Sequence, residues 1–178
     1  MYPYLRWLSV VFRRRKQRGI GLLFDESRVR FHVWPGDLDF FGHMNNGRYL
    51  TLMNSGRFDL ITRLGLLPHM KENRMISVLG GATIRFKRPL RPFQRFDLIT
   101  RIVGWDTKWF YIEQHFESEG KLVADALVRG LFRAPGKSIP TKEVLTMLGY
   151  TKESPPLAPH VVEWGRWQDE TLVAPQPV

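Results

Sequence analysis

Residues 37–49 read Asp-Leu-Asp-Phe-Phe-Gly-His-Met-Asn-Asn-Gly-Arg-Tyr, and no other stretch of the chain gathers carboxylates, a histidine and amides so densely. Before it, residues 28–34 alternate apolar and polar side chains, which is typical of a strand with one buried face. After it, residues 49–64 repeat apolar side chains at helical spacing. The polar residues therefore lie on a strand-to-helix connection, the kind of segment on which sites are usually built.

The helix that follows is predicted to run from about Asn46 to Leu64. Asn45 or Asn46 is expected to cap its N-terminus, and Gly65 to end it. One apolar stripe runs along the helix and consists of Tyr49, Met53, Gly56, Leu60 and Leu64. A helix that is apolar over so much of its circumference needs a cover on more than one side.

Four further strand-like runs supply that cover, and no second long helix interrupts them. They are residues 82–86, 96–103, 109–117 and 122–132. Hairpin-like joints at residues 105–108 and 118–120 separate the last three runs, and a short helix is expected at residues 141–148. We therefore predict an α+β fold in which a curved antiparallel sheet wraps around one central helix. The open edges of such a sheet favour a dimer with a continuous sheet.

A length of 178 residues suits one domain with terminal arms. We place an N-terminal arm at residues 1–24, the folded domain at residues 25–150 and a C-terminal tail at residues 151–178. The tail is rich in proline and is expected to be extended, held to the domain by Trp164 and Trp167. The absence of cysteine excludes disulfides, thiolate metal sites and a cysteine nucleophile.

The N-terminal arm carries much of the formal charge of +10, because residues 1–19 hold six basic side chains and no acidic one. Its apolar start is too short to span a bilayer, and the charges follow that run instead of preceding it as in a signal peptide. Two interpretations stay open: residues 1–19 lie on an anionic membrane surface, or the arm docks on the domain or a second subunit. The expected location is the cytoplasm, at the inner face of a membrane under the first interpretation. A charge run alone predicts no specific nucleic-acid site.

The pattern Asp-x-Asp-x-x-Gly-His-Met-Asn-Asn-x-x-Tyr at residues 37–49 resembles the signature of hotdog-fold acyl-CoA thioesterases of the 4-hydroxybenzoyl-CoA thioesterase superfamily. With Gly56 and Arg57 further on, it looks most like the branch that contains thioesterase-superfamily member 6 and its bacterial relatives. Residues 85–96 and 104–111 extend the match. The resemblance covers about residues 25–150 and leaves the arm and the tail outside.

The resemblance implies hydrolysis of an acyl-CoA thioester at a site between the subunits of a homodimer or a dimer of dimers. In the family the second carboxylate of the Asp-x-Asp pair acts as nucleophile or general base, and it falls on Asp39. The oxyanion donor is the amide at the start of the central helix, which maps to the backbone N–H of Asn46 or a neighbour. The residues suit this chemistry, since a thioester carbonyl needs an activated oxygen and donors for the developing oxyanion. We expect no cofactor and no metal ion.

Several residues of the motif keep more than one role open. Asp39 is also a common turn residue. His43 is expected to share the base role, to orient Asp39 by a hydrogen bond or to contact the substrate, and otherwise only to satisfy backbone groups. The side chains of Asn45 and Asn46 are expected to cap the helix, with Asn45 bordering the substrate. Tyr49 belongs either to the core or to the wall of the substrate site.

Basic side chains after the first downstream run offer donors for the phosphates of coenzyme A. Arg88 and Arg91 flank Pro89 and are the predicted contacts. Arg85 and Lys87 alternate away from the core and are expected on the solvated outer face of the sheet. Cationic strand ends are also common at exposed edges, which is the alternative for Arg88 and Arg91.

Two departures from the relatives bear on catalysis. Asn54 stands where several hotdog relatives carry an acidic residue on the helix, and Phe41 stands where plant acyl-carrier-protein thioesterases use asparagine. Arg57 is given no catalytic role and is expected to form an ion pair or to face the subunit contact. A second hypothesis therefore stays open, a non-catalytic protein that binds acyl groups or acyl-CoA at a membrane surface.

Overall fold

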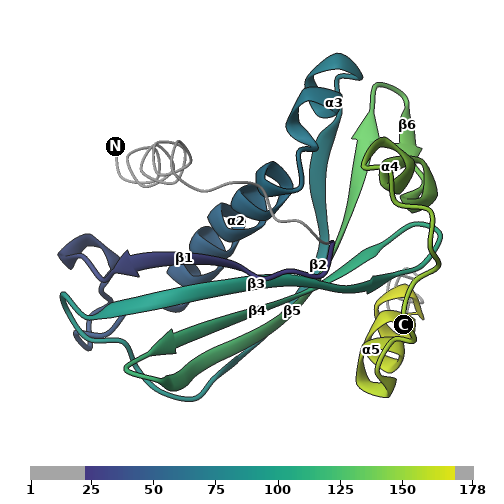
Figure 1. Cartoon of the computed structure of the whole chain (residues 1–178). Helices are drawn as coiled ribbons and strands as arrows, with labels where there is room; N and C mark the ends of the chain where they lie inside the picture. The colour runs from purple at the N-terminus through teal and green to yellow at the C-terminus, as the bar shows by residue number, and fades with distance from the viewer. Residues whose placement is uncertain (1–22, 171–178) are drawn as a thin grey trace, which may run out of the picture.

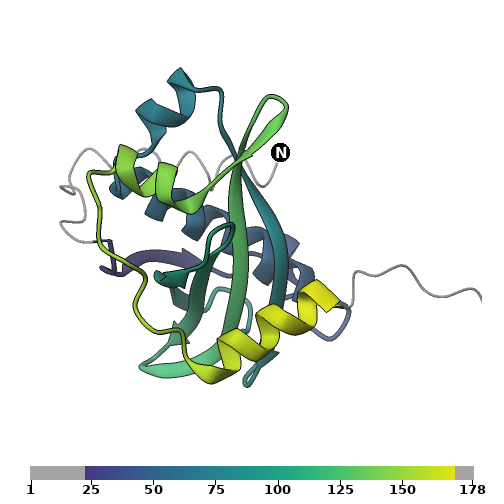
Figure 2. The same cartoon turned by 90° about the vertical axis from the view of Figure 1, so that its right-hand side faces the viewer.

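The computed structural model describes residues 23–170, which form one curved sheet with a helix on each face (Figures 1 and 2). The strands are β1 (Ser27–His32), β2 (Ile76–Phe86), β3 (Arg95–Trp105), β4 (Phe110–Ser118), β5 (Lys121–Ala134) and β6 (Lys137–Ile139). The helices are η2 (Pro35–Asp37, a 3₁₀ helix), α2 (Asn46–Arg63), α3 (Leu67–Glu72), α4 (Thr141–Met147) and α5 (Pro159–Glu170). The strands pair antiparallel in the order β1-β3-β4-β5-β2, and β6 pairs with β5. The predicted α+β fold, with a curved antiparallel sheet around one central helix, is confirmed.

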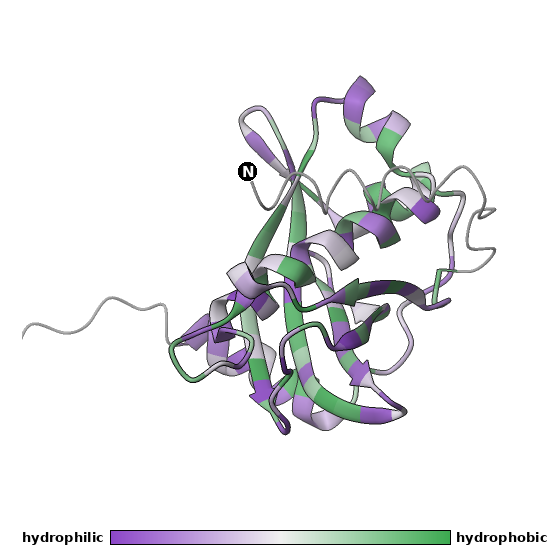
Figure 3. Ribbon diagram, turned by 90° about the vertical axis from the view of Figure 1, so that its left-hand side faces the viewer, coloured by the Kyte–Doolittle hydropathy of each residue, from purple (hydrophilic) through white to green (hydrophobic). Residues whose placement is uncertain are grey.

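Buried and exposed residues alternate in β1, and bands of hydrophobic and hydrophilic residues follow one another along the strands in Figure 3. In β1, Val29 and Phe31 are buried, whereas Arg28 and Arg30 are exposed. Arg30 lies opposite Asp97 of β3, and its Nε donates to the carboxylate over 2.8 Å. This hydrogen bond, together with the charges of both arginines, holds the pKa of Asp97 below its usual value.

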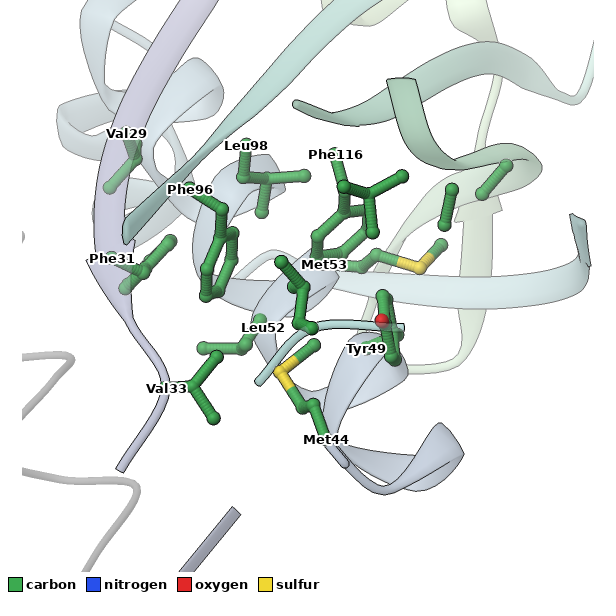
Figure 4. Packing of buried hydrophobic residues seen from close by; sticks show 14 of the residues in the cluster. Val29, Phe31, Val33, Met44, Tyr49, Leu52, Met53, Phe96, Leu98 and Phe116 are labelled. Carbon is green, nitrogen blue, oxygen red and sulfur yellow. The ribbon is translucent and has the colours of Figure 1, made fainter. Parts of the chain in front are cut away.

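The central helix α2 begins where the sequence predicts. Asn45 caps it, because its Oδ1 accepts a hydrogen bond from Gly47 N over 2.8 Å. Tyr49, Met53 and Leu60 of the predicted stripe are buried. In Figure 4 the first two of these side chains face the apolar side chains of β3 and β4. The apolar stripe of α2 is therefore the inner layer of the core.

Gly56 brings α2 close to the middle of the sheet. A Cβ atom at this position would lie 2.6 Å from Thr100 Oγ1 and 2.8 Å from Leu98 Cδ2, so a larger residue fits only if its neighbours shift. Beside it, the fully buried Gln114 donates from Nε2 to Met53 O (3.0 Å) and to Thr100 Oγ1 (2.9 Å). Polar contacts thus tie the helix to the sheet in the centre of an apolar interface.

The prediction of an extended tail is wrong for residues 159–170, which form α5 on the outer face of the sheet (Figure 2). Pro159 stands at the first helical position, where its missing N–H leaves no hydrogen bond unmade. Trp164 is half-buried against the sheet, but Trp167 is 56% exposed. The segment is therefore a helical cover of the sheet, and Trp164 belongs to the apolar cluster between them. The arm up to residue 22 and the last residues of the tail, 171–178, lie outside the described residues.

Arg129 of β5 joins α5 to the sheet. Its side chain is fully buried, and its guanidinium lies 4.5 Å from the centre of the Trp109 ring. Nη1 donates to Gly165 O (3.3 Å) and to Asp169 Oδ1 (2.7 Å) of α5. The ring, the carbonyl and the carboxylate together replace much of the hydration that the buried cation loses.

Strand β2 is longer than the sequence predicts, since it begins at Ile76 and not at Ala82. Gly80 and Gly81 obscure the alternation, and the register against β5 shifts there, as in a β-bulge. Trp109 occupies the space that a side chain at Gly80 would need. Within the described residues, β2 has no partner on its other side and forms an edge of the sheet. The short elements α3 and β6 are absent from the prediction.

Candidate active site

The connection between β1 and α2 is held in place by Asp37. Its buried carboxylate accepts from Trp34 N over 2.8 Å, and its Oδ1 lies 3.7 Å from Arg48 Nε. Its backbone oxygen accepts from Asn45 N over 2.8 Å, at the start of the helix. Asp37 therefore fixes the angle at which the chain enters α2, which agrees with a structural role.

Asp39 lies in the turn that follows. Its backbone N donates to His43 O over 2.8 Å, and Gly42 at φ 76° lets the chain reverse. Asp39 Oδ1 accepts from Phe41 N (2.9 Å) and from His43 N (3.3 Å). Within residues 23–170, Oδ2 of this half-buried side chain has no hydrogen-bond partner. The turn thus orients the carboxylate and leaves one oxygen open to a ligand.

The first turn of α2 presents a backbone donor beside this loop. The N–H of Gly47 is taken by the Asn45 side chain, and the N–H of Arg48 by Asn45 O (2.9 Å). No acceptor for the N–H of Asn46 is found in the part of the chain that the structure describes. Asn46 is exposed, and a free N–H at the positive end of a helix dipole suits an oxyanion.

His43 is half-buried at the end of the Asp39 turn. Its backbone satisfies the turn, but no hydrogen bond from its ring is found among the described residues. The predicted orientation of Asp39 by the imidazole is therefore not realised in this arrangement. A shared base role and a contact with substrate stay predictions.

Tyr49 occupies a core position, because its side chain is only 2% exposed. Its ring packs on Phe86 (centroids 5.0 Å apart) and on Phe116 (4.9 Å). Burial raises the pKa of the Tyr49 hydroxyl to about 12, partly offset by its hydrogen bond with the backbone of Leu90. Of the two roles left open for Tyr49, the described contacts are those of a core residue, and a contact with substrate stays a prediction.

Four basic residues near the end of β2 separate into two pairs. Arg85 and Lys87 approach Asp125 on the outer face, at 2.6 Å and 3.7 Å, as their alternation predicts. Arg88 and Arg91 are exposed and have no ion pair within residues 23–170. The second pair therefore keeps its charge available for an anionic ligand.

A cavity of about 70 Å³ lies beside α2, against the edge strand β2. Its apolar lining includes Leu60, Ile61, Leu79, Ile102, Phe110 and Phe132. Asn54 and Arg57 supply polar groups, and Arg57 Nη1 donates to Gln114 Oε1 over 2.8 Å. Burial lowers the pKa of Arg57 to about 10. The ion pair predicted for Arg57 is not found among the described residues, and sequence spacing carries no signal for its contact with Gln114.

Residues 23–170 contain neither a cluster of metal ligands nor a membrane-spanning helix. No three His, Asp or Glu side chains there are grouped so that they could hold a metal ion. None of the helices described is long and apolar enough to cross a membrane.

Comparisons with known proteins agree with this fold. A sequence profile of the Thioesterase-like superfamily matches residues 33–165. Protein THEM6 of Xenopus laevis is 36% identical over 171 residues, covering 96% of this chain and 82% of that protein. Protein THEM6 of Danio rerio is 41% identical over 131 residues, covering 72% of this chain and 65% of that protein. A probable thioesterase from Bartonella henselae superposes with a TM-score of 0.60 at 22% identity, over 65% of this chain and 98% of that one.

The profile spans the Asp39 loop, α2 and strands β2 to β6, and the structural neighbours share the sheet wrapped around one helix. The predicted family resemblance is thereby confirmed. The chain belongs to the Thioesterase-like superfamily and is a hotdog-fold thioesterase of the THEM6-like branch.

Proposed function

We propose that this thioesterase hydrolyses acyl-CoA thioesters, with Asp39 as nucleophile or general base and the N–H of Asn46 as oxyanion donor. One observation carries the proposal. A carboxylate with an open oxygen and a helix N-terminus with an open N–H belong to the same short loop. Membership of the family supports thioester chemistry at this loop.

In the general-base form, Asp39 takes a proton from water while the water oxygen bonds to the thioester carbon. The carbonyl electrons move to the oxygen, which the N–H of Asn46 and the helix dipole stabilise. The C–S bond then breaks, and the proton passes to the thiolate of coenzyme A as the free acid forms. In the nucleophilic form, an Asp39 oxygen bonds to the carbon itself, coenzyme A leaves, and water hydrolyses the anhydride.

Other residues of the loop and of the strand ends bind the substrate in this proposal. Arg88 and Arg91 meet phosphates of coenzyme A, because each carries an exposed guanidinium and phosphates favour bidentate donors. Asn45 borders the thioester from its position as helix cap. His43 shares the base role or contacts the substrate, and Tyr49 supports the start of α2 from the core.

We also propose that two chains pair through β2 and that the active site lies between them, in a homodimer or a dimer of dimers. β2 is an edge strand of 11 residues that exposes Ile76, Leu79 and Phe86. Phe86 touches Tyr49 near the Asp39 loop, whereas Leu79 lines the cavity beside α2. Antiparallel pairing of two β2 strands would therefore bring the loop of one chain towards the cavity of the other. The sedimentation coefficient of Leu79→Lys should be that of a monomer.

Contact of residues 1–19 with an anionic membrane stays a proposal that rests on their six basic side chains. They lie outside the described residues. Sedimentation with anionic vesicles, for the full chain and for a chain that begins at residue 20, tests the proposal. Equal sedimentation of the two would contradict it.

The test of the central proposal is release of free thiol from a panel of acyl-CoAs by the wild type, Asp39→Asn and Glu26→Gln. Glu26 is an exposed carboxylate outside the loop and serves as control. Loss of Asp39 should slow turnover by about 10² to 10⁴, the usual contribution of a general base. Equal rates for the wild type and Asp39→Asn would remove Asp39 from the mechanism. Saturable binding of acyl-CoA without any thiol release would favour the alternative, a non-catalytic binding protein.

A further inference from the structure

Arg57 is a partly buried cation that the proposed hydrolysis does not use. It lies on α2, eleven residues after Asn46 and so about 16 Å further along the helix axis. Its guanidinium borders the cavity between α2 and the edge strand β2. The side chain therefore faces a space that lies on the same helix as the oxyanion donor but well beyond the reacting atoms.

The charge of Arg57 is poorly compensated within the described residues. Its hydrogen bond there goes to the neutral amide of Gln114, and no carboxylate lies within ion-pair distance. A guanidinium has five N–H donors, and those of Arg57 that have no partner among the described residues are accessible to solvent or to a ligand. Burial lowers the pKa of Arg57 to about 10, which still leaves the group protonated at neutral pH. A partly buried cation beside an apolar wall is stabilised by an anionic partner, and the described residues supply none to Arg57.

The cavity sets the size of that partner. Its volume of about 70 Å³ corresponds to roughly five water-sized positions, counting about 10–15 Å³ for each. Leu60, Ile61 and Leu79 make most of the nearby wall apolar, which suits hydrocarbon beside the charged group. A carboxylate with the last few carbons of a chain fits this volume and this mixture of surfaces.

We propose that Arg57 binds a carboxylate at the far end of the acyl group, so that the preferred substrates are CoA thioesters of dicarboxylic acids. The inference rests on the proposed acyl-CoA substrate, but it concerns recognition and not the hydrolytic step. The carboxylate supplies the acceptor oxygens that the open N–H groups of Arg57 need, and the methylene chain lies against the apolar wall. A simple fatty acyl group would leave the cation unpaired in the same cavity.

The test compares two non-hydrolysable thioether analogues of acyl-CoA, one ending in a methyl group and one of equal length ending in a carboxylate. Chains of eight, twelve and sixteen carbons cover the span between the loop and the cavity. Calorimetry on the wild type should give at least about tenfold tighter binding of the carboxylate analogue at one of these lengths, as expected for a hydrogen-bonded charge.

Substitutions at Arg57 test whether this residue causes the preference for the carboxylate analogue. In Arg57→Leu the ratio of the two affinities should fall to one or below, and Arg57→Lys should keep part of the ratio, because it keeps the charge but not the planar fork. Arg101→Gln is the matched control, since Arg101 pairs with Glu113 on the outer face. Its affinity ratio should equal that of the wild type.

Equal affinities of the two analogues in the wild type, an unchanged ratio in Arg57→Leu, or no binding of either analogue would overturn the inference. An unchanged ratio combined with weaker dimerisation of Arg57→Leu would assign the cation to the subunit contact instead. The expected ratio without hydrolysis of the corresponding thioesters would contradict the proposed function and leave the inference standing.

Discussion

The two faces of the sheet carry helices that are held in different ways, and each interface contains an arginine, fully buried on the outer face and partly buried on the inner face. On the outer face, Arg129 meets the Trp109 ring and the Asp169 carboxylate of α5. On the inner face, Arg57 of α2 meets the neutral Gln114. Within the described residues the outer cation has a carboxylate partner, whereas the inner one has a neutral amide and borders a cavity. Arg129 therefore stabilises the packing of α5 on the sheet, whereas Arg57 is the residue for which we infer a ligand.

The helices also differ in how close they come to the strands. Gly56 of α2 lies where a Cβ would meet Thr100 at 2.6 Å, in the middle of the sheet. Gly165 of α5 lies where a Cβ would meet the Tyr111 hydroxyl at 2.8 Å, nearer the rim. The inner contact belongs to the main core and the outer one to a small cluster, so damage to the inner interface should cost more.

The largest effect on stability is therefore expected at Gly56. Gly56→Val should lower the free energy of unfolding by about 3 kcal/mol, because the added atoms overpack the contact between helix and sheet. Thr51→Val, on the exposed side of the same helix, is the control. Midpoints of urea unfolding measure both. Equal midpoints for Gly56→Val and the wild type would contradict the close approach.

A smaller effect is expected on the outer face. Arg129→Met should cost about 2 kcal/mol, since it removes a cation–π contact and hydrogen bonds to α5. Asp169→Asn should cost less, because that side chain is 61% exposed. A double-mutant cycle in urea measures the coupling of the two residues. A coupling near zero would show that the carboxylate does not compensate Arg129.

The side-chain cap of α2 should contribute less to the stability of the fold than the contacts of Arg129 do. Asn45→Ala should lower the free energy of unfolding by about 1 kcal/mol, because the N–H of Gly47 loses its acceptor. Asn45→Asp keeps an acceptor and should recover most of the loss. Thermal unfolding of the two variants compares them, and equal losses would show that the side-chain oxygen is not what stabilises the helix start.

The smallest effect is expected for an exposed counterpart of the outer pair, Arg30 with Asp97. Hydrogen bonding to Arg30 lowers the pKa of Asp97, so the pair stabilises the fold above the unfolded-state pKa near 4 and loses that effect as pH falls through the lower folded-state pKa. Asp97→Asn should therefore reduce stability slightly at pH 7 and less at about pH 2. Solvent and salt screen a pair this exposed. A loss that does not depend on pH would contradict an electrostatic cause.

Much of the inner layer could be predicted from the sequence, because α2 and the strands bury side chains at regular spacing and Asn45 and Gly65 mark the helix ends. The carboxylate and the helix start of the site could be predicted as well, since they are neighbours along the chain. The helix and the strand length of the outer layer could not be predicted in this way. Prolines around residues 155–159 obscure the start of α5, and Gly80 interrupts the alternation of β2.

The contacts that distinguish Arg57 from Arg129 could not be predicted from the sequence either. Arg57 meets Gln114 from a separation of 57 residues, and Arg129 meets Asp169 from a separation of 40. Only the packing of the helices on the sheet brings such residues together, because no local period links them. Their charge state depends on burial, which composition does not reveal.

The most direct test of the central claim is the rate of a single turnover by Asp39→Asn, with enzyme in excess over an acyl-CoA that the wild type hydrolyses. The affinity for the matching thioether analogue is measured on the same preparation. The account predicts near wild-type binding and a rate at least about a hundredfold slower, because the carboxylate acts on the reacting atoms and the loop remains folded. Wild-type binding together with a wild-type rate would contradict it.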